Sequence, residues 1–195
     1  MEMQGSRALA ITQSQAWGAL NDPEVLKVCI PGCDKLEASG ENRYLLGVAV
    51  KVGPVSARFA GKITLSEVQP PDSSTLSFDG QGGAAGFGKG QADVKLTPQG
   101  TGCELSYSVK AQVGGKIAQV GQRLIDGVAR AMAEDFFKRF DQEMQRRYPQ
   151  AYADAAAALP AGDAAPVPAG KSIPVWVWVA GVVLVVLLVW WLRGM

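Results

Sequence analysis

The sequence of 195 residues contains no histidine. Catalytic pairs of serine or cysteine with histidine, and zinc sites with histidine ligands, are therefore excluded. An excess of one charge is also lacking, because 19 lysines and arginines face 18 aspartates and glutamates and leave a net charge of +1. Domains that bind nucleic acid carry a clear basic excess. We therefore expect no nucleic-acid partner.

Cysteine is scarce, with only Cys29, Cys33 and Cys103. The first two are separated by three residues, unlike the CxxC pairs of many redox and metal sites, and one further cysteine does not complete a tetrahedral or iron–sulfur ligand set. We expect structural cysteines and no metal site. Residues 1–11 are polar and alternating and lack the apolar run of a secretory signal. The domain is therefore expected in the reducing cytoplasm.

The longest helical pattern runs from Lys116 to Tyr148. Its apolar residues recur at intervals of three and four, and such residues share one face of a helix. They are Ile117, Val120, Leu124, Val128, Met132, Phe136 and Phe140. The proline after Tyr148 disfavours the helical conformation at that tyrosine. We predict one helix of about 33 residues and about 50 Å, whose apolar stripe requires a partner surface.

Most of the chain before this helix alternates between apolar and polar residues, which predicts half-buried strands. A strand over 1–11 precedes two short helices, at 14–20 and at about 22–28, and Asp22 and Pro23 fit the start of the second. Further strands are predicted at 43–52, 55–66, 75–80, 90–97 and 103–113. The predicted order is one strand, two short helices, about six antiparallel strands and one long helix.

We interpret this order as an α+β fold in which a curved antiparallel sheet wraps around the long C-terminal helix, because a sheet with one apolar face needs a cover. Small residues on the predicted inward face would leave a cavity under the helix: Ala57, Gly61, Gly90, Ala92 and Ala111. Phe59, Phe78, Phe87 and Leu124 are predicted to form its wall or mouth. Tyr107 lies on the apolar side of its strand, where it either packs or offers its hydroxyl group to a ligand.

Residues 151–172 are rich in alanine, proline and glycine and are predicted to be a linker after a domain over 1–150, although 152–159 would also suit a helix. Residues 173–192 contain no charge, and twenty such residues just span the hydrocarbon core of a bilayer. Trp176, Trp178, Trp190 and Trp191 lie at its two ends, as in the aromatic belts of membrane helices. We predict a single C-terminal transmembrane anchor, with the domain on the cytoplasmic side of the cell membrane.

A glycine-rich stretch, residues 83–89, fits GxxxxGK, the first seven positions of a phosphate-binding loop. The eighth position, which must be Ser or Thr, is Gly90. Residues 91–97 alternate like a strand, whereas such a loop opens a helix whose N-terminus holds the phosphate. We therefore predict no nucleotide site and interpret the glycines as a flexible hairpin beside the mouth of the cavity.

Several short motifs support a family assignment: DPEVL at 22–26, CIPGC at 29–33, VGPV at 52–55, FAG at 59–61, PP at 70–71, GGAAGFGKG at 82–90 and VGGKIAQVGQRLID at 113–126. Together they resemble the CoxG family of carbon monoxide dehydrogenase over about residues 1–148. The resemblance implies a START-like, helix-grip fold of the SRPBCC superfamily, in agreement with the order of elements. It supplies no catalytic residues, and the linker and anchor lie outside the shared core.

The resemblance implies an accessory protein, without a catalytic role of its own, of a molybdenum-containing carbon monoxide dehydrogenase or related hydroxylase. Such proteins are associated with recruitment of the enzyme to the membrane and with its link to respiratory quinone. An apolar cavity beside a lipid reservoir suits a hydrophobic ligand. We therefore expect a bound quinone, menaquinone or ubiquinone, although a lipid satisfies the same physics. The residues expected around it are Phe59, Gly61, Phe78, Phe87, Ala92, Tyr107 and Leu124.

Two other functions stay open. The protein could be a pure adaptor or assembly factor that recruits the dehydrogenase and has no functional ligand. It could also be an enzyme, as some START-like cyclases are, and the available polar groups are Tyr44, Arg58, Lys62, Asp93 and Glu104. Most of these fall on the outward side of their strands, where solvated charges are the ordinary arrangement. We do not expect an enzyme.

Overall fold

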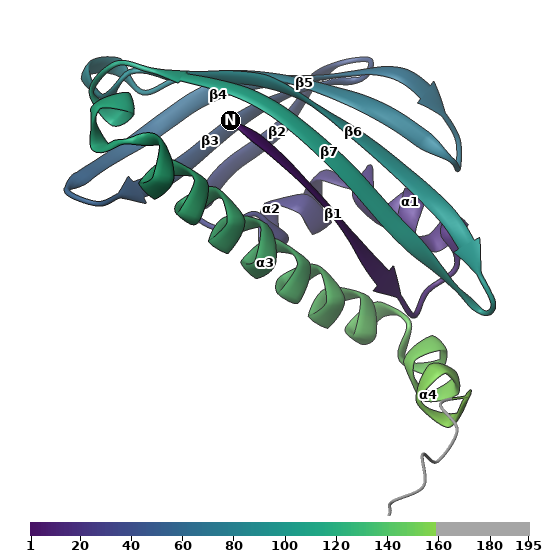
Figure 1. Cartoon of the computed structure of the whole chain (residues 1–195). Helices are drawn as coiled ribbons and strands as arrows, with labels where there is room; N and C mark the ends of the chain where they lie inside the picture. Colours follow the sequence, from purple (N-terminus) through teal and green to yellow (C-terminus); the bar gives the residue numbers. More distant parts are fainter. Residues whose placement is uncertain (159–195) are drawn as a thin grey trace, which may run out of the picture. The chain divides into compact units, whose positions relative to one another are not determined.

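Seven antiparallel strands form one curved sheet in the computed structural model, which describes residues 1–158 (Figure 1). The strands are β1 (Glu2–Leu9), β2 (Cys33–Gly40), β3 (Arg43–Val52), β4 (Val55–Gln69), β5 (Ser73–Gln81), β6 (Phe87–Gln99) and β7 (Gly102–Gly114). Their order is β1-β7-β6-β5-β4-β3-β2. Strands β2 to β7 are thus successive hairpins, and β1 pairs with β7 at the edge. The predicted curved antiparallel sheet is confirmed.

The helical segments are α1 (Gln13–Leu20), α2 (Pro23–Cys29), the 3-10 turns η1 (Gly83–Ala85) and η2 (Lys116–Val120), α3 (Gln122–Arg147) and α4 (Pro149–Ala158). Helix α3 runs beneath the sheet, as the predicted cover does (Figure 1). The two short helices begin as their sequences indicate. Thr12 and Gln15 form a capping box on α1, while the Asp22 carboxylate accepts a hydrogen bond from the Glu24 amide at 2.9 Å at the start of α2.

The long helix begins later than predicted. Residues 116–120 form the 3-10 turn η2, and Gly121 follows with φ 95° and ψ 143°, a conformation that interrupts a helix and that other residues rarely adopt. The continuous helix α3 therefore has 26 residues. Its predicted end is confirmed, because Tyr148 has left the helical region at φ −129° and ψ 58° immediately before Pro149.

Strand β2 is an element to which the alternation of residues assigned no range. It lies at an edge of the sheet, pairs only with β3, and its register shifts twice along that pairing. Leu36 is its one buried residue. Since an edge strand with one buried side chain shows no period of two, the sequence pattern does not reveal it.

The compact unit extends from Met1 to Ala158, past the predicted boundary at residue 150. Helix α4 accounts for the difference, because Tyr148, Ala151 and Tyr152 pack against the main core. The remaining part of the predicted linker and the predicted anchor at 173–192, with Trp176, Trp178, Trp190 and Trp191, lie outside the described residues. Within residues 1–158, no helix is both long and apolar enough to cross a bilayer.

Two separate clusters make up the core. The larger lies where α1 and α2 meet the sheet and the C-terminal half of α3, and includes Phe140 and Met144, both fully buried. The smaller consists of Val52, Ile117 and Ile125 near the start of α3. Helix α3 is thus held to the sheet near its two ends, and the space between these contacts is where a ligand can lie.

Candidate ligand-binding cavities

Two apolar cavities lie between the sheet and α3. The one on the side of α1 and α2, which we call the inner cavity, has a volume of about 290 Å³; the one on the side of η1 and η2, the tip cavity, has about 280 Å³. The inner cavity is lined by Trp17, Tyr44, Ala92, Tyr107, Phe136 and Phe137, among others. The tip cavity is lined by Leu46, Phe59, Phe78, Phe87, Val113 and Met132, among others.

The two cavities are neighbours along the strands. On β3, Tyr44 lines the inner cavity and Leu46, the next residue on the same face, lines the tip cavity. On β5, Leu76 and Phe78 divide in the same way, while Val109 of β7 lines both cavities. A ligand that displaces the side chains between them would therefore occupy one continuous apolar channel under α3.

Hydrogen-bonding groups are few and are placed in the inner cavity. The phenol rings of Tyr44 and Tyr107 both line it. Neither phenol has a hydrogen-bond partner within residues 1–158, and both are therefore free to donate to a ligand. Tyr107 lies against the Phe137 ring, with 5.4 Å between centroids, and occupies the space above Gly5, where a Cβ atom would come within 2.7 Å of the phenol oxygen.

Two phenylalanines of the tip cavity pack on glycines. The Phe59 ring lies where a Cβ of Gly82 would be, at 2.6 Å, and the Phe87 ring does the same over Gly114. Gly86 also approaches the backbone of Gly114 too closely for any side chain. The glycines of this segment therefore serve close packing of the β5–β6 hairpin against the end of β7.

The GxxxxGK stretch is a hairpin turn and not a phosphate loop. Residues 83–85 form η1, and Lys89 belongs to β6, so that no helix begins where a bound phosphate would need one. The amides of Ala85 and Gly86 donate to carbonyls of the same turn, those of Gly82 and Gly83, both at 3.1 Å. The predicted hairpin at this position is confirmed.

The seven predicted ligand-binding residues are distributed over both cavities. Phe59, Gly61, Phe78 and Phe87 line the tip cavity, and Ala92 and Tyr107 line the inner cavity. Leu124 lines neither; it is 42% exposed and lies beside the turn at Gly53. The sequence reasoning overlooked Tyr44 as a cavity residue together with the aromatic pair Phe136 and Phe137, because only the strand register brings β3, β6 and β7 over that part of α3.

Gly61 has a different role from the one expected of it. A Cβ at this position would lie 2.5 Å from the carbonyl oxygen of Asp79 and 2.9 Å from the Cα of Gly80. Gly61 therefore allows β4 and β5 to approach each other, and a larger residue there would separate the strands instead of filling the cavity. Ala92, which borders open space in the inner cavity, is the suitable position for that purpose.

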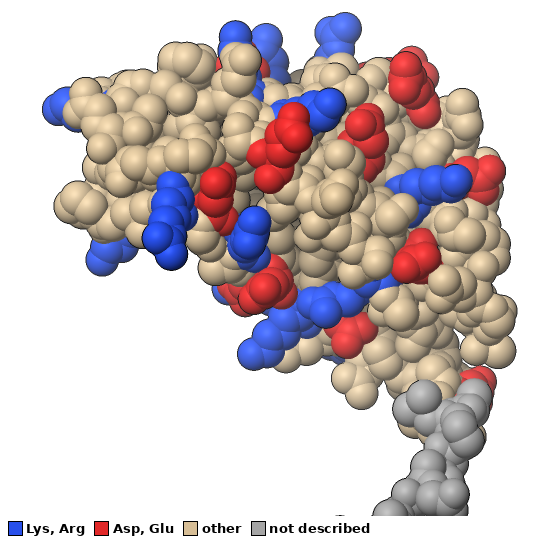
Figure 2. All heavy atoms as spheres, in the orientation of Figure 1, with Lys and Arg blue, Asp and Glu red and all other residues tan. Residues whose placement is uncertain are grey.

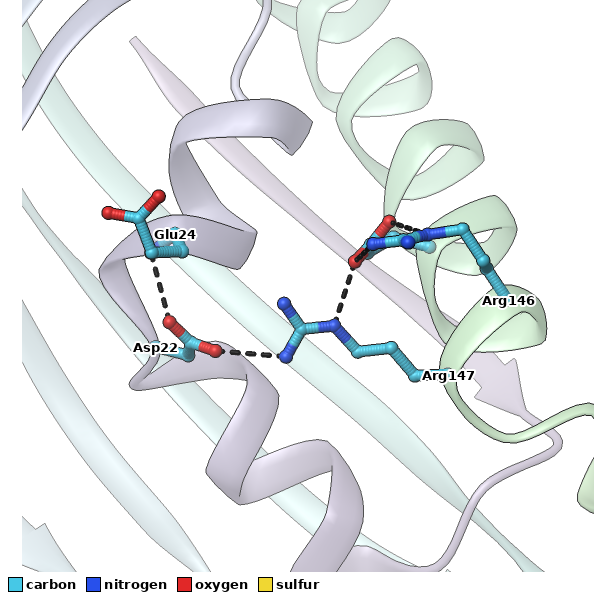
Figure 3. A network of polar contacts seen from close by, with 5 residues as sticks. Asp22, Glu24, Arg146 and Arg147 are labelled. Carbon is cyan, nitrogen blue, oxygen red and sulfur yellow. Dashed lines mark hydrogen bonds and ion pairs between the residues drawn. The ribbon is translucent and has the colours of Figure 1, made fainter.

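An ionic network holds α3 to α2 at the end remote from the tip cavity (Figure 3). Arg147 donates to Asp22 at 2.9 Å and to Glu143 at 2.7 Å, and Arg146 donates to Glu143 at 2.6 Å. Hydrogen bonds from Arg146 and Arg147 lower the pKa of Glu143 to about 2. Glu143 is 8% exposed. The network thus fixes the C-terminal end of α3 and leaves its N-terminal end to the glycine-flanked turn η2.

Polar groups suitable for catalysis do not gather in the cavities. Arg58 pairs with Asp34 at 2.8 Å between exposed side chains, and Asp93 accepts from Thr75 at 2.9 Å. Burial raises the pKa of all three cysteine thiols, that of Cys29 to about 11, which makes them poor nucleophiles. No cluster of three acidic or cysteine ligands for a metal occurs in residues 1–158.

Comparison with protein families gives a match of residues 5–145 to the model of the carbon monoxide dehydrogenase protein CoxG. Comparison with curated proteins gives no match. Among solved structures, a conserved protein from Geobacillus kaustophilus is 35% identical with a TM-score of 0.71, and the alignment covers 75% of this chain and 96% of that one.

Two more distant structures share the fold alone. A START superfamily protein from Mycobacterium smegmatis is 11% identical with a TM-score of 0.58, covering 74% of this chain and 97% of that one. The Zhui aromatase/cyclase from Streptomyces sp. R1128 is 12% identical with a TM-score of 0.53, covering 75% and 94%. The described unit therefore has the START-like architecture.

Proposed function

Because the chain belongs to the CoxG family of carbon monoxide dehydrogenase, we propose that it is a membrane-tethered accessory protein that carries a hydrophobic ligand, a respiratory quinone, for a molybdenum-containing carbon monoxide dehydrogenase or related hydroxylase. The family name implies association with that dehydrogenase. The charge-free segment at 173–192 would anchor the protein in the membrane, and recruitment of the enzyme there would bring its electrons to the quinone pool.

The observation that carries this proposal is the pair of apolar cavities under α3. Each is at or just below the lower end of the range of about 300–1,000 Å³ that is usual for ligand pockets. This space suits one ring system with part of a chain, and not a whole two-chain lipid. The walls are almost entirely aliphatic and aromatic, so a ligand with one polar end and a long apolar remainder fits their chemistry best.

The polar groups suggest which end lies where. A quinone ring has two carbonyl oxygens that accept hydrogen bonds, and the free phenols of Tyr44 and Tyr107 are donors in the inner cavity. The tip cavity offers an apolar path for the isoprenoid tail. Phe87 lines this cavity and is also 37% exposed, which places it at the opening. We therefore assign the ring to the inner cavity and the tail to the tip cavity.

A carrier explains the polar groups better than an enzyme does. Arg58 and Asp34 are paired on the outside, and the cavities contain phenols but no carboxylate–base pair of the kind that acid–base catalysis uses. The likeness to an aromatase/cyclase concerns the fold alone. Binding and release of a ligand require only the apolar walls and the two donors that are present.

The direct test is to extract the purified full-length protein with organic solvent and to identify the extract by mass spectrometry. Recovery of menaquinone or ubiquinone in near-stoichiometric amount is the expected result. A phospholipid in its place would make the protein a lipid carrier, and an empty extract together with retained binding of the dehydrogenase would make it a pure adaptor.

A matched pair of variants shows whether the ligand occupies the inner cavity. Ala92→Leu fills part of that cavity and is expected to reduce bound quinone severalfold while costing less than the roughly 1–3 kcal/mol of an overpacked core. Ala60→Leu makes the same change at an exposed position of β4 and is expected to leave the bound quinone unchanged. Equal loss in both variants would contradict the assignment.

A further inference from the structure

Three chain segments meet at one end of the fold, which we call the tip: residues 50–57 of the β3–β4 hairpin, residues 80–88 of the β5–β6 hairpin, and residues 113–125 from the end of β7 to the first turn of α3. Contacts link all three, because Gly86 lies against Gly114 and Gly115, and Gly53 lies against Leu124. In Figure 1 the tip is the end of the sheet where α3 begins, opposite α4. The tip cavity opens here, at Phe87.

The charges of the tip have one sign. Its three segments contain Lys51, Lys116 and Arg123 and no aspartate or glutamate. All three cations are exposed, and none takes part in an ion pair within residues 1–158. Figure 2 shows blue side chains and no red ones at this end of the visible face, whereas both colours alternate over the rest. Since the whole chain has a net charge of +1, this separation is local and is not a consequence of composition.

Large apolar side chains are exposed at the same place. Residues 1–158 expose four such side chains, and two of them, Phe87 and Leu124, belong to the tip. Leu124 lines neither cavity, and its outward position on α3 has no packing role beyond its contact with Gly53. Exposed aromatic and aliphatic groups among lysines and arginines are the usual composition of surfaces that enter the interface of a membrane.

We propose that the tip is a docking surface for an anionic lipid bilayer, with Lys51, Lys116 and Arg123 against the phosphate groups and Phe87 and Leu124 among the outer ends of the acyl chains. This surface surrounds the opening of the tip cavity, so that docking gives a hydrophobic ligand a path that avoids water. The inference extends the proposed function and rests on it for the purpose of docking, but the charge and exposure of the tip stand independently of any ligand.

The tether would permit this contact. Residues 159–172 number fourteen, and a fully extended segment of that length reaches about 43 Å at about 3.1 Å per residue. Helix α3 has 26 residues and is about 39 Å long. A segment that leaves the domain beside the far end of α3 is therefore long enough for the tip to reach the bilayer that holds the predicted anchor.

The test measures vesicle binding of residues 1–158, the compact unit, which matches nearly the whole length of a solved relative and can therefore be studied without the anchor. The vesicles are phosphatidylcholine alone or phosphatidylcholine mixed with phosphatidylglycerol, at low and high salt. The charge variant combines Lys51→Gln, Lys116→Gln and Arg123→Gln. Its matched control combines Lys27→Gln, Lys95→Gln and Lys138→Gln, which remove three exposed, unpaired cations from outside the tip within residues 1–158.

We expect binding only to the anionic vesicles, with loss at high salt. One lysine or arginine near such a surface contributes roughly a factor of five, so the tip variant is expected to lose about a hundredfold in partition coefficient, and the control much less. Leu124→Ser is expected to weaken binding severalfold more than Val28→Ser, which changes an exposed residue of α2.

Equal binding to both kinds of vesicle, or equal loss in the tip variant and its control, would overturn the proposal. So would a tip variant that keeps its vesicle binding but no longer binds the purified dehydrogenase, because the tip would then be a protein-docking surface. Failure of the proposed carrier function gives a different result: no quinone in the extract while vesicle binding still depends on the tip.

Discussion

At the scale of single residues, Tyr44 and Tyr107 are decisive for the ligand, because they are hydrogen-bond donors in the inner cavity that have no protein partner within residues 1–158. A buried phenol of this kind either faces water in the cavity or a ligand oxygen. The two tyrosines come from strands that are not neighbours in the sheet, β3 and β7, and the curvature of the sheet brings both into the lining of one cavity.

We predict that Tyr44→Phe and Tyr107→Phe each weaken binding of a short-chain naphthoquinone by about two- to tenfold, the effect of losing one net hydrogen bond of about 0.5–1.5 kcal/mol. The apolar wall is kept in both variants, so the melting temperature is expected to change little. Titration monitored by intrinsic fluorescence measures the affinity. Tyr148→Phe, outside both cavities, is the control, and unchanged affinity in both cavity variants would show that the ring lies elsewhere.

At the scale of elements, α3 is attached differently at its two ends. Its C-terminal end is tied to α2 by the network around Glu143, whereas its N-terminal end follows η2, a turn flanked by Gly115 at φ 86° and Gly121 at φ 95°. The glycines fix the direction in which the chain leaves β7 and enters the helix. These two attachments predict opposite responses to pH and to backbone substitution.

The ionic attachment should be sensitive to acid. Because the folded-state pKa of Glu143 lies near 2, below its ordinary value of 4.5, its ionised form stabilises the fold fully above about pH 4.5, and this contribution is lost as the pH falls towards 2. Glu143→Gln is expected to lower the free energy of unfolding by about 1–2 kcal/mol at pH 7, since both arginines remain partly solvated, and by much less at pH 3. Urea unfolding at both pH values measures this, with Glu134→Gln as control; an equal loss at both would contradict the assigned pKa.

The glycine attachment predicts opposite effects of one substitution at two positions. Gly121→Ala places a side chain at φ 95° and ψ 143° and is expected to destabilise by roughly 1–3 kcal/mol, although no atom lies within 4 Å of the new Cβ. Gly127→Ala lies inside α3 with equal space around it and is expected to stabilise by about 0.5–1 kcal/mol. Thermal unfolding of both variants measures the difference. The same sign in both would mean that the backbone at Gly121 is not strained for alanine.

Periodicity predicts the elements that have one continuous buried face. Strands β4, β6 and β7 and helix α3 alternate regularly and lie where the sequence pattern indicates, while β2, with only Leu36 buried, and the break at Gly121 leave no periodic signal. The cavities are harder to predict, since their lining depends on pairings between distant residues. The inward parity of Gly61 was evident, yet only the distance to Asp79 shows that this glycine serves strand approach.

At the scale of the whole molecule, the border between the domain and its C-terminal segment decides how the two can be separated. Composition placed this border at residue 150, but α4 belongs to the compact unit, which ends at Ala158. Tyr152 packs on the main core and donates a hydrogen bond to Asp141 at 2.5 Å. A chain that stops before α4 would expose the core surface which that helix covers.

Two truncations test this border and the anchor together. A chain ending at Ala158 is expected to keep the melting temperature of the full-length domain and to leave the membrane fraction after a high-salt wash, because the wash removes the electrostatic attraction of the tip and the apolar segment 173–192 is gone. A chain ending at Tyr148 is expected to be released in the same way but to lose about 1–3 kcal/mol of stability, from the buried surface and hydrogen bond of Tyr152. Sedimentation of membranes and urea unfolding of the released proteins measure the two effects. If the Ala158 chain still sediments after the wash, residues 173–192 are not the anchor, and if it unfolds, the C-terminal segment contributes to the fold itself.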